Sequence, residues 1–355
     1  MQNLWRVIAI ACFALVTVIG CAAPTPTPTP VPTVTPTATK SPIPAPTRRG
    51  ERGAQNVPPT STPTRARTQT LFPTATNIPT KTPLPAGKIT RVDTKYKSAA
   101  LNEDRKVIIY LPPGYNDSPQ RRYPVLILLH GYGGCLDPEP EWEAWGLKDD
   151  LESLTTKGQI QPMIVALPNG FMGDCQPSYW FNHGPGTDNK RWGDAVSQDL
   201  VNYLDATYRT IKSKESRALG GYSLGGQGAL SLSLRNPEIF KVVGAHSPSF
   251  RSADGSIVFI NDWNYFNQYD PIYLTQNTNA AQQLTLWLDV GDDDDKVRRC
   301  GTGSDRCVEA YRALLVARKI AHEWHGDWDG KHEGTYWSEH IPDYLKWYST
   351  KLKGQ

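Results

Sequence analysis

A glycine-rich turn between a short apolar run and a helix-forming run constrains this chain more than any other feature. Residues 221–225 read Gly-Tyr-Ser-Leu-Gly, with Ser223 at the centre. So tight a turn from strand to helix needs glycine at the flanking positions, because a Cβ atom there would clash. The serine then projects beside the free N–H groups of the helix N-terminus, which favour negative charge. The pattern predicts a nucleophilic Ser223; the alternative is a structural turn serine.

The rest of residues 88–355 alternates strand and helix patterns around that turn. Besides the run before Gly221, apolar runs predict strands at residues 89–96, 106–111, 123–130, 163–167, 241–247, 284–290 and 322–328. Helical spacing predicts a helix ending at Leu234 and others at residues 147–154, 194–208, 307–319 and 340–352. This alternation predicts an α/β fold with a doubly wound, mostly parallel sheet and helices on both faces. Residues 251–280 are polar and irregular, and we expect them to cover the site.

A serine becomes a good nucleophile only when a base takes its proton. Three of the seven histidines, His322, His325 and His340, lie inside predicted strands or helices. His332 instead lies in the loop after the last predicted strand, at the edge of the sheet where sites form in such folds. We therefore expect His332 to be the base; the alternative is a histidine on a surface loop.

A carboxylate must orient the imidazole and stabilise its charged form. In the chain order serine, acid, histidine, this acid lies between the other two, at the end of a strand. Four consecutive aspartates occupy residues 292–295, directly after a predicted strand. We predict Asp294, with Asp293 and Asp295 as rivals. The alternatives for the whole run are a calcium-binding loop and a solvated acidic loop.

The negative oxygen that forms on an attacked carbonyl needs N–H donors, each of which lowers the barrier by about 3 kcal/mol. Leu224, the residue after the nucleophile, is expected to supply one backbone N–H. The second is expected from Tyr132, in a loop that reads His-Gly-Tyr-Gly-Gly at residues 130–134. The glycines of this loop allow it to approach the substrate closely.

Residues 1–21 read as a targeting segment. Arg6 gives a positive start, an apolar stretch of 14 residues follows at 7–20, and the segment ends Val-Ile-Gly-Cys at Cys21. The stretch is too short for a comfortable membrane span. Its end resembles the cleavage box of bacterial lipoproteins, which implies lipid attachment at Cys21, a membrane anchor and a cell-surface or periplasmic protein. The alternatives are an ordinary signal peptide with secretion and an uncleaved anchor.

Residues 22–87 hold 16 of the 30 prolines. This segment is also rich in threonine and shows no apolar periodicity. Such a segment cannot bury enough surface to offset its chain entropy, so we expect a disordered linker. The linker carries a net charge of +6 and the leader +1, so the overall +3 leaves −4 for residues 88–355. A nucleic-acid-binding domain would be basic, and we expect no nucleic-acid partner.

Apart from Cys12 and Cys21 in the leader, four cysteines remain: Cys135, Cys175, Cys300 and Cys307. Four cysteines in an exported protein predict two disulfides, with three possible connectivities. The short spacing favours Cys300 with Cys307, which leaves Cys135 with Cys175. The spacings do not form the array of a metal site, and we expect no metal.

Five segments of the folded part match one known family. They read Leu-Leu-His-Gly-Tyr-Gly-Gly at 128–134, Pro-Met-Ile-Val-Ala-Leu-Pro-Asn-Gly at 162–170, Arg-Ala-Leu-Gly-Gly-Tyr-Ser-Leu-Gly-Gly-Gln-Gly-Ala-Leu at 217–230, Asn-Pro-Glu-Ile-Phe at 236–240 and Gly-Lys-His-Glu-Gly-Thr-Tyr-Trp at 330–337. The chain resembles the esterase D-like "putative esterase" family of α/β-hydrolases. That family includes feruloyl, acetyl-xylan and enterochelin esterases, S-formylglutathione hydrolases and mycolyltransferases.

The resemblance runs from about residue 105 to the C-terminus and implies acyl transfer through an acyl-enzyme on Ser223, without a cofactor. The family spacing Gly-x-x-Asp selects Asp294. Tyr222 and Leu224 occupy positions where leucine and methionine are more common in this family. We expect both changes to be harmless replacements of one apolar side chain by another.

The implied activity is that of a serine carboxylic-ester hydrolase for small-molecule or polysaccharide-linked esters, acetyl or feruloyl esters of carbohydrates above all. The alternatives are an acyltransferase of the mycolyltransferase type, a non-catalytic binding module on this fold, and a lipase or peptidase. Carbohydrate esters are preferred over long-chain lipids because residues 251–280 are polar. Some tryptophans near predicted loops either stack on sugar or hydroxycinnamoyl rings or pack in the core: Trp142, Trp145, Trp180, Trp192 and Trp337.

Overall fold

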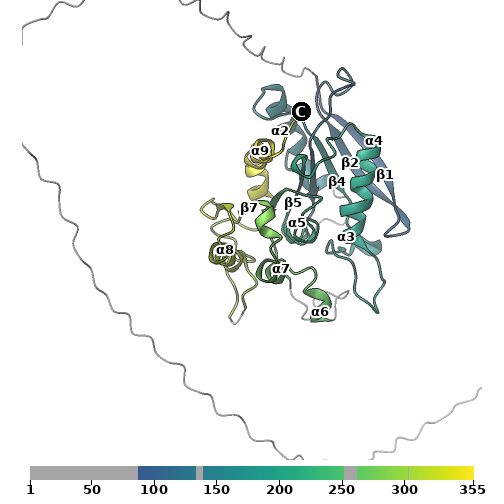
Figure 1. Ribbon diagram of the computed structural model, residues 1–355. Helices are drawn as coiled ribbons and strands as arrows, with labels where there is room; N and C mark the ends of the chain where they lie inside the picture. The colour runs from purple at the N-terminus through teal and green to yellow at the C-terminus, as the bar shows by residue number, and fades with distance from the viewer. Residues whose placement is uncertain (1–86, 133–138, 252–261, 303) are drawn as a thin grey trace, which may run out of the picture. The chain divides into compact units, whose positions relative to one another are not determined.

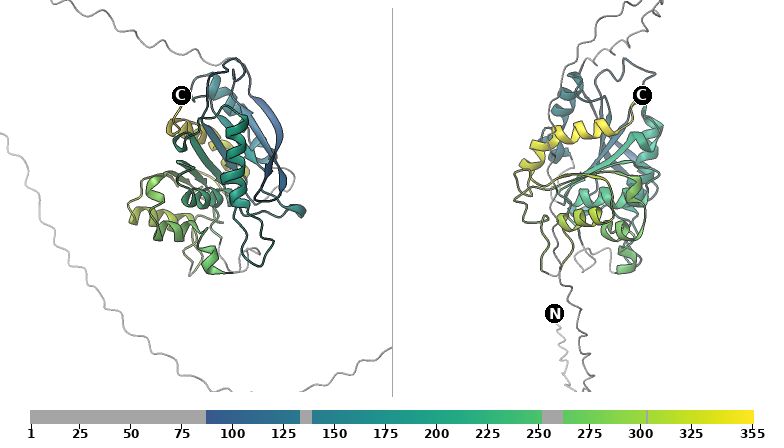
Figure 2. Two further views of the ribbon diagram at one scale, coloured as in Figure 1. Left: turned by 45° about the vertical axis from the view of Figure 1, so that its right-hand side comes forward. Right: turned by 60° about the vertical axis from the view of Figure 1, so that its left-hand side comes forward.

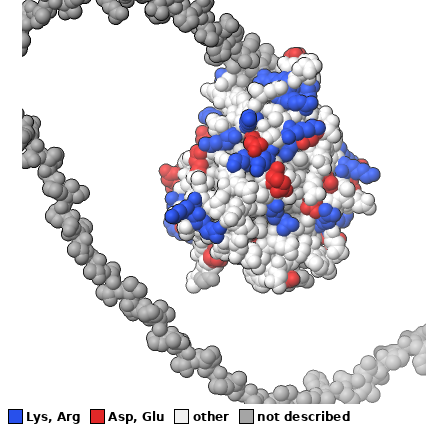
Figure 3. Space-filling model, in the orientation of Figure 1, with Lys and Arg blue, Asp and Glu red and all other residues white. Residues whose placement is uncertain are grey.

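The computed structural model describes residues 87–132, 139–251, 262–302 and 304–355. The chain divides into two units, residues 1–74 and residues 75–355, and the second unit contains every described residue. The leader with Cys21, the linker up to residue 86 and Cys135 therefore lie outside the described residues. Within the described ranges, no helix is both long enough and apolar enough to cross a membrane. Positive and negative side chains are intermixed on the face that Figure 3 shows.

One mixed sheet forms the centre of the described part (Figure 1). Its order is β1-β2-β4-β3-β5-β6-β7-β8. The strands are β1 (Thr90–Ser98), β2 (Glu103–Leu111), β3 (Val125–Leu129), β4 (Ile164–Pro168), β5 (Arg217–Tyr222), β6 (Val242–His246), β7 (Thr285–Asp289) and β8 (His322–His325). The pairs β1–β2 and β2–β4 are antiparallel, and all pairs from β4 to β8 are parallel. The prediction of a mostly parallel sheet is confirmed.

Helices cover both faces of this sheet (Figure 2). They are α1 (Glu139–Ala144), α2 (Leu147–Thr156), α3 (Trp192–Asp194), α4 (Val201–Thr207), α5 (Leu224–Arg235), α6 (Trp263–Phe266), α7 (Pro271–Asn277), α8 (Val308–Ala317) and α9 (Gly334–Lys351), with a π-helical stretch at Ala195–Leu200 between α3 and α4. Along β3, Ile127 and Leu129 belong to one buried cluster with residues of α4, α5, α7 and α8, whereas Leu126 and Leu128 belong to another with residues of α2 and α9. Period-two alternation buries both faces, which explains the continuous apolar run.

The strand register gathers the predicted site loops. Leu129 of β3 lies opposite Gly221 of β5, and Tyr222 lies opposite His246 of β6. Asp289, at the end of β7, lies opposite His325, at the end of β8. Because these strands are parallel, the loops that follow β3, β5, β7 and β8 all leave from one edge of the sheet.

The end of strand β8 and the start of helix α9 differ from the predictions. Strand β8 ends at His325 and not at residue 328, because the chain leaves the sheet and the Trp328 carbonyl accepts the Asp292 N–H. Helix α9 begins at Gly334, six residues before the predicted start. Residues 334–338 are poor helix formers, but burial of Tyr336 and Trp337 in the core between the sheet and α9 outweighs their low helix propensity.

Residues 262–280 are more regular than the irregular pattern of residues 251–280 predicts. Residues 252–261 lie outside the described residues, but the remainder contains α6 and α7. The side chains of Asp262 and Asp270 accept N–H groups in the first turns of these helices, and Pro271 opens α7. An aspartate followed by such a run is a helix-start signal that the sequence reading missed.

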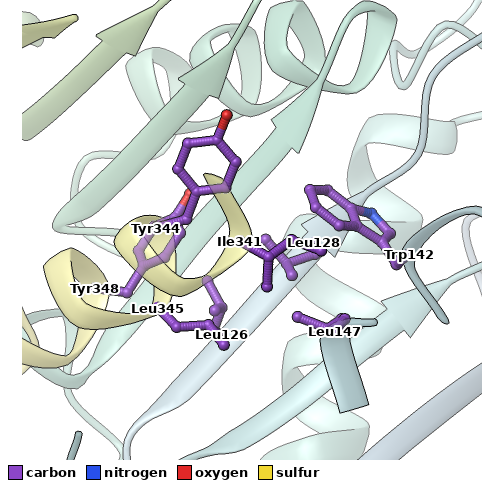
Figure 4. Close-up of a pocket in the computed structure, with 8 residues that line it drawn as sticks. All are labelled: Leu126, Leu128, Trp142, Leu147, Ile341, Tyr344, Leu345 and Tyr348. Carbon is purple, nitrogen blue, oxygen red and sulfur yellow. The ribbon is translucent and has the colours of Figure 1, made fainter. Parts of the chain in front are cut away.

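The layer between the sheet and α9 holds a cavity of about 10 Å³ (Figure 4). Its lining comes from β3, α1, α2 and α9 and is apolar apart from tyrosine and tryptophan side chains. A cavity of this size holds about one water molecule at most, so it is a packing gap in the core and no substrate site.

The disulfide prediction is confirmed for one pair. Cys300 and Cys307 form a disulfide, with Cα atoms 4.9 Å apart, just before α8. Cys175 is also disulfide-bonded. Because Cys135 lies outside the described residues, its pairing with Cys175 stays a prediction.

Candidate active site

Ser223 occupies a strained turn between β5 and α5. Its φ of 53° and ψ of −118° lie where residues other than glycine are rarely found, at a cost of about 1–3 kcal/mol. The turn is held by the Ser223 N–H, which donates to the His246 carbonyl at 2.9 Å. A Cβ atom on Gly221 would lie 2.5 Å from the backbone of Gly225, and one on Gly225 would lie 2.5 Å from the Leu129 carbonyl oxygen. The two glycines are therefore a steric requirement of this turn.

The predicted serine, histidine and aspartate meet in one hydrogen-bonded row. His332 Nε2 lies 2.8 Å from Ser223 Oγ, and His332 Nδ1 lies 2.8 Å from Asp294 Oδ2. If the carboxylate accepts a hydrogen bond from Nδ1–H, the lone pair on Nε2 faces the serine hydroxyl. Ser223 is 8% exposed, so the row lies just below the surface. This arrangement is suited to moving a proton from serine to histidine.

The loop after β7 fixes Asp294 for this contact. Asp294 is buried, and its Oδ1 accepts the backbone N–H groups of Lys296 at 3.1 Å and Val297 at 3.2 Å. One carboxylate oxygen is thus held by the loop, which leaves Oδ2 for His332.

The other three aspartates of the run are exposed and face elsewhere. The Asp292 carboxylate accepts the Gly330 N–H at 3.1 Å, and the Asp293 N–H donates to the Gly330 carbonyl at 3.1 Å. The Asp293 carboxylate lies 3.5 Å from Lys331 Nζ in an exposed ion pair. Asp292 and Asp293 therefore join the aspartate loop to the loop that carries the histidine. In the described ranges, no group of three or more His, Cys, Asp or Glu side chains could hold a metal ion.

The two predicted N–H donors, Tyr132 and Leu224, belong to the loop after β3 and to the start of α5. Leu224 is the first residue of α5, so its N–H has no acceptor one helical turn earlier. The loop after β3 packs directly on the turn: a Cβ atom on Gly131 would lie 2.5 Å from the Tyr222 ring. Tyr132 follows Gly131 in this loop, and its role as the second N–H donor beside Leu224 stays a prediction.

His130 fixes this loop and takes no part in the hydrogen-bonded row. The Gly170 N–H donates to His130 Nε2 at 2.9 Å, and Nδ1 lies 2.8 Å from the Gly131 carbonyl oxygen. Burial lowers the pKa of His130 to about 4, so the ring is neutral at pH 7 and Nδ1 carries its hydrogen. The histidine of the His-Gly motif therefore locks the loop that carries Tyr132.

The tryptophans noted in the sequence belong mainly to the core. Four of them are at most 4% exposed, which favours packing over sugar stacking: Trp142, Trp180, Trp192 and Trp337. Trp180 Nε1 donates to the His130 carbonyl, and the Trp337 ring lies edge-on to His332 at 5.0 Å between centroids. Trp145 is partly buried and stacks on Trp337. Trp180 and Trp337 therefore pack against residues of the site loops.

The expectation that Tyr222 is a purely apolar replacement is wrong. Its hydroxyl donates to the Glu141 carboxylate of α1, the first helix after the Tyr132 loop. Burial raises the pKa of Glu141 to about 7. The contact ties α1 to the residue before Ser223, and it joins positions 81 residues apart, so no local sequence pattern announces it.

Comparisons with known proteins find relatives in sequence and in fold. The sequence profile of the family described as "Putative esterase" matches residues 98–348. Over 136 residues the chain is 31% identical to an endo-1,4-beta-xylanase/feruloyl esterase of Xylanibacter ruminicola, a match that covers 37% of this chain and 18% of that protein. The chain therefore spans less than a fifth of the length of that relative.

Two solved structures show the same fold. A ferulic acid esterase superimposes with a TM-score of 0.62 at 22% identity, covering 74% of this chain and 99% of the other. An S-formylglutathione hydrolase from Agrobacterium tumefaciens gives a TM-score of 0.62 at 17% identity, with 76% and 97% covered. The predicted α/β-hydrolase fold is confirmed. Because the profile covers more than half of the sequence, this chain belongs to the "Putative esterase" family.

Proposed function

We propose that this protein is a serine carboxylic-ester hydrolase that acts through an acyl-enzyme on Ser223. The observation that carries the proposal is the row of two 2.8 Å contacts that joins Asp294, His332 and Ser223. The serine stands at a strained turn, beside a helix N-terminus that stabilises negative charge. Membership of an esterase family supports the same reaction class.

The reaction proceeds in two halves. Ser223 Oγ attacks the ester carbonyl while His332 Nε2 takes its proton, and Asp294 stabilises the charged imidazole. The N–H groups of Leu224 and Tyr132 donate to the oxyanion of the tetrahedral intermediate. The alcohol leaves with the proton from His332, and an acyl group stays on Ser223. Water, deprotonated by His332, then attacks this acyl-enzyme and releases the acid.

We assign the substrate to acetyl or feruloyl esters linked to carbohydrates. Support comes from relatives whose names include feruloyl esterase and xylanase. Two aromatic rings are open to solvent, since Tyr132 in the loop after β3 is 53% exposed and Trp263 at the start of α6 is 49% exposed. Rings at such exposure offer faces on which sugar or hydroxycinnamoyl rings pack.

We also propose that the enzyme is exported and held at the membrane. Residues 1–21 form the leader, Cys21 carries the lipid, residues 22–87 form the linker and residues 88–355 form the catalytic domain. Cys21→Ser should move the protein from the membrane fraction to the medium or periplasm with its esterase activity unchanged. Membrane association that persists in this variant would count against lipidation.

The substrate assignment is tested by a panel of esters on the purified protein. Acetylated xylo-oligosaccharide, a feruloylated sugar, 4-nitrophenyl acetate and an emulsified long-chain triglyceride are compared, each with and without an added alcohol acceptor. We expect free acid as the product and the highest kcat/KM on the sugar esters. Faster triglyceride turnover would overturn the substrate class, and dominant acyl transfer to the alcohol would overturn hydrolysis.

A further inference from the structure

Arg251 lies beside the first turn of α5, next to the proposed nucleophile. The Ser249 N–H donates to the Ser223 carbonyl at 3.0 Å, and the Arg251 N–H donates to Gln227 Oε1 at 2.8 Å. Gln227 is fully buried one turn into the helix, so it is a fixed anchor. Arg306 Nη1 donates to the Arg251 carbonyl at 3.0 Å. The backbone that carries Arg251 is therefore held on both sides.

The Arg251 guanidinium lies over the ring of Tyr132, 5.8 Å from its centroid. Tyr132 is the residue whose backbone N–H we propose as an oxyanion donor, so the positive charge lies on the oxyanion side of Ser223. The Tyr132 ring also meets Tyr179 at 6.4 Å. Burial raises the pKa of Tyr179, and the positive charge of Arg251 opposes that rise. The charge of Arg251 is therefore felt at both tyrosines, Tyr132 and Tyr179.

Within the described ranges, Arg251 differs from its neighbour Arg306 in having no carboxylate that neutralises its charge. Arg306 forms two hydrogen bonds with the Asp270 carboxylate, at 3.1 and 2.8 Å. Among the described residues, no acidic side chain pairs with Arg251, and its Nε is buried without a hydrogen-bond partner. A partly buried guanidinium without an anion is costly, and an anionic ligand would offset that cost.

On the basis of the proposed hydrolase function, we propose that Arg251 and Tyr132 form a subsite for a carboxylate carried by the ester substrate. A guanidinium binds a carboxylate through two parallel hydrogen bonds, and the exposed Tyr132 ring covers the apolar atoms beside it. The carboxylate belongs either to the acyl half, as in a hemiester of a dicarboxylic acid, or to the alcohol half, as in an ester of a uronic-acid sugar. Both place the same chemistry on Arg251.

Two matched pairs of esters separate these sources. On the acyl side, mono-4-nitrophenyl succinate replaces the terminal methyl of 4-nitrophenyl butyrate with a carboxylate. On the alcohol side, an O-acetylated methyl glucuronoside replaces the hydroxymethyl group of the O-acetylated methyl glucoside with a carboxylate. Initial rates of the full-length protein are measured at low and high salt, after subtraction of spontaneous hydrolysis.

We expect kcat/KM to favour the anionic member of one pair by about 10- to 100-fold, mainly through KM, and the preference to weaken with salt. Arg251→Gln should remove most of that preference and change kcat/KM for the neutral ester by less than about threefold. Arg251→Lys should keep part of the preference, because it retains the charge without the planar fork.

Arg312→Gln is the matched control. Arg312 also lies over a ring, that of Trp324, but Trp324 belongs to β8, three strands from β5, roughly 14 Å away across the sheet. This variant should keep both activity and preference. If the wild type hydrolyses the neutral esters but favours neither anionic ester, the subsite is refuted and the hydrolase proposal stands. If Ser223→Ala leaves all rates unchanged, the hydrolase proposal itself fails.

Discussion

Two of the aspartate–histidine pairs in the described part of the chain differ in their surroundings: one faces a serine and the other does not. In the first, His332 Nδ1 lies 2.8 Å from Asp294 Oδ2; in the second, His246 Nδ1 lies 2.6 Å from Asp289 Oδ2. The second pair is fully buried between β6 and β7, whereas the His332 side chain retains 12% of its exposure. The contact between acid and imidazole is thus nearly the same in both, and it does not by itself mark a reactive site.

The surroundings of the two pairs differ in what they leave available. Asp289 also accepts hydrogen bonds from Trp287 Nε1 and from the Tyr336 and Tyr344 hydroxyls, at 2.6, 2.9 and 3.1 Å. His246 Nε2 meets the Tyr348 hydroxyl at 3.1 Å, inside the core. The second pair therefore ties three residues of α9 to the sheet. A pair becomes reactive when its free nitrogen faces a strained, accessible nucleophile.

The buried pair supports the reactive one. The His246 carbonyl accepts the Ser223 N–H and so holds the turn. Tyr336, which donates to Asp289, follows His332 by four residues at the start of α9. The buried pair thus holds backbone on both sides of the catalytic row. Substitutions in the buried pair should mainly lower stability, and substitutions in the reactive pair should mainly lower catalysis.

The largest effect should come from Asp294→Asn. The amide cannot stabilise charged His332, and we expect kcat per folded molecule to fall by about 10²- to 10⁴-fold. Single Asp→Asn variants at 292, 293 and 295, assayed beside it, should each lose less than about tenfold because these side chains are exposed. A greater loss at 293 or 295 would reassign the acid, and no large loss in any variant would place the acid elsewhere.

Asp289→Asn should show the opposite pattern. Changing a buried, fully hydrogen-bonded carboxylate costs about 3–5 kcal/mol of unfolding free energy. We expect a clear fall in the urea midpoint, while kcat per folded molecule changes less than about tenfold. A thousandfold loss of kcat at unchanged stability would make Asp289 the functional acid and reverse the comparison.

A third histidine, His130, predicts how stability depends on pH. Its folded pKa of about 4 lies below the ordinary 6.5, so between pH 4 and 6.5 the unfolded chain binds more protons than the folded one. His130 therefore contributes fully above pH 6.5, and about 3 kcal/mol is lost as the pH falls to 4. Urea unfolding at pH 7 and pH 4.5 measures this. His130→Asn should flatten the dependence; an equally steep dependence in that variant would exclude His130 as its source.

The smallest effect is expected for Tyr348→Phe, which removes the hydroxyl that His246 faces. Loss of one buried hydrogen bond should cost about 1–2 kcal/mol of stability and leave kcat unchanged. Thermal unfolding and ester kinetics on the same preparation test this. A fall in kcat larger than the fall in stability would show that the buried pair takes part in catalysis.

The sequence predicted what local sterics and spacing dictate. The glycines around Ser223 are a steric requirement at short range, and the spacing from Gly291 selects Asp294, whose rivals are exposed. The early start of α9 was missed because packing outweighs poor helix propensity there. The contact of Tyr222 with Glu141 joins positions 81 residues apart, which no local pattern reveals.

The central claim, that Ser223 is the nucleophile, is tested most directly by covalent labelling. The active protein is treated with a fluorophosphonate, a reagent that reacts covalently with nucleophilic serines. The labelled protein is then digested, and the adduct is located by mass spectrometry. We predict one adduct, on Ser223, with labelling much slower in His332→Ala. Ser223→Ala should take up no label and turn over 4-nitrophenyl acetate at least about 10⁴-fold more slowly. An adduct on another residue, or near wild-type turnover in folded Ser223→Ala, would contradict the account.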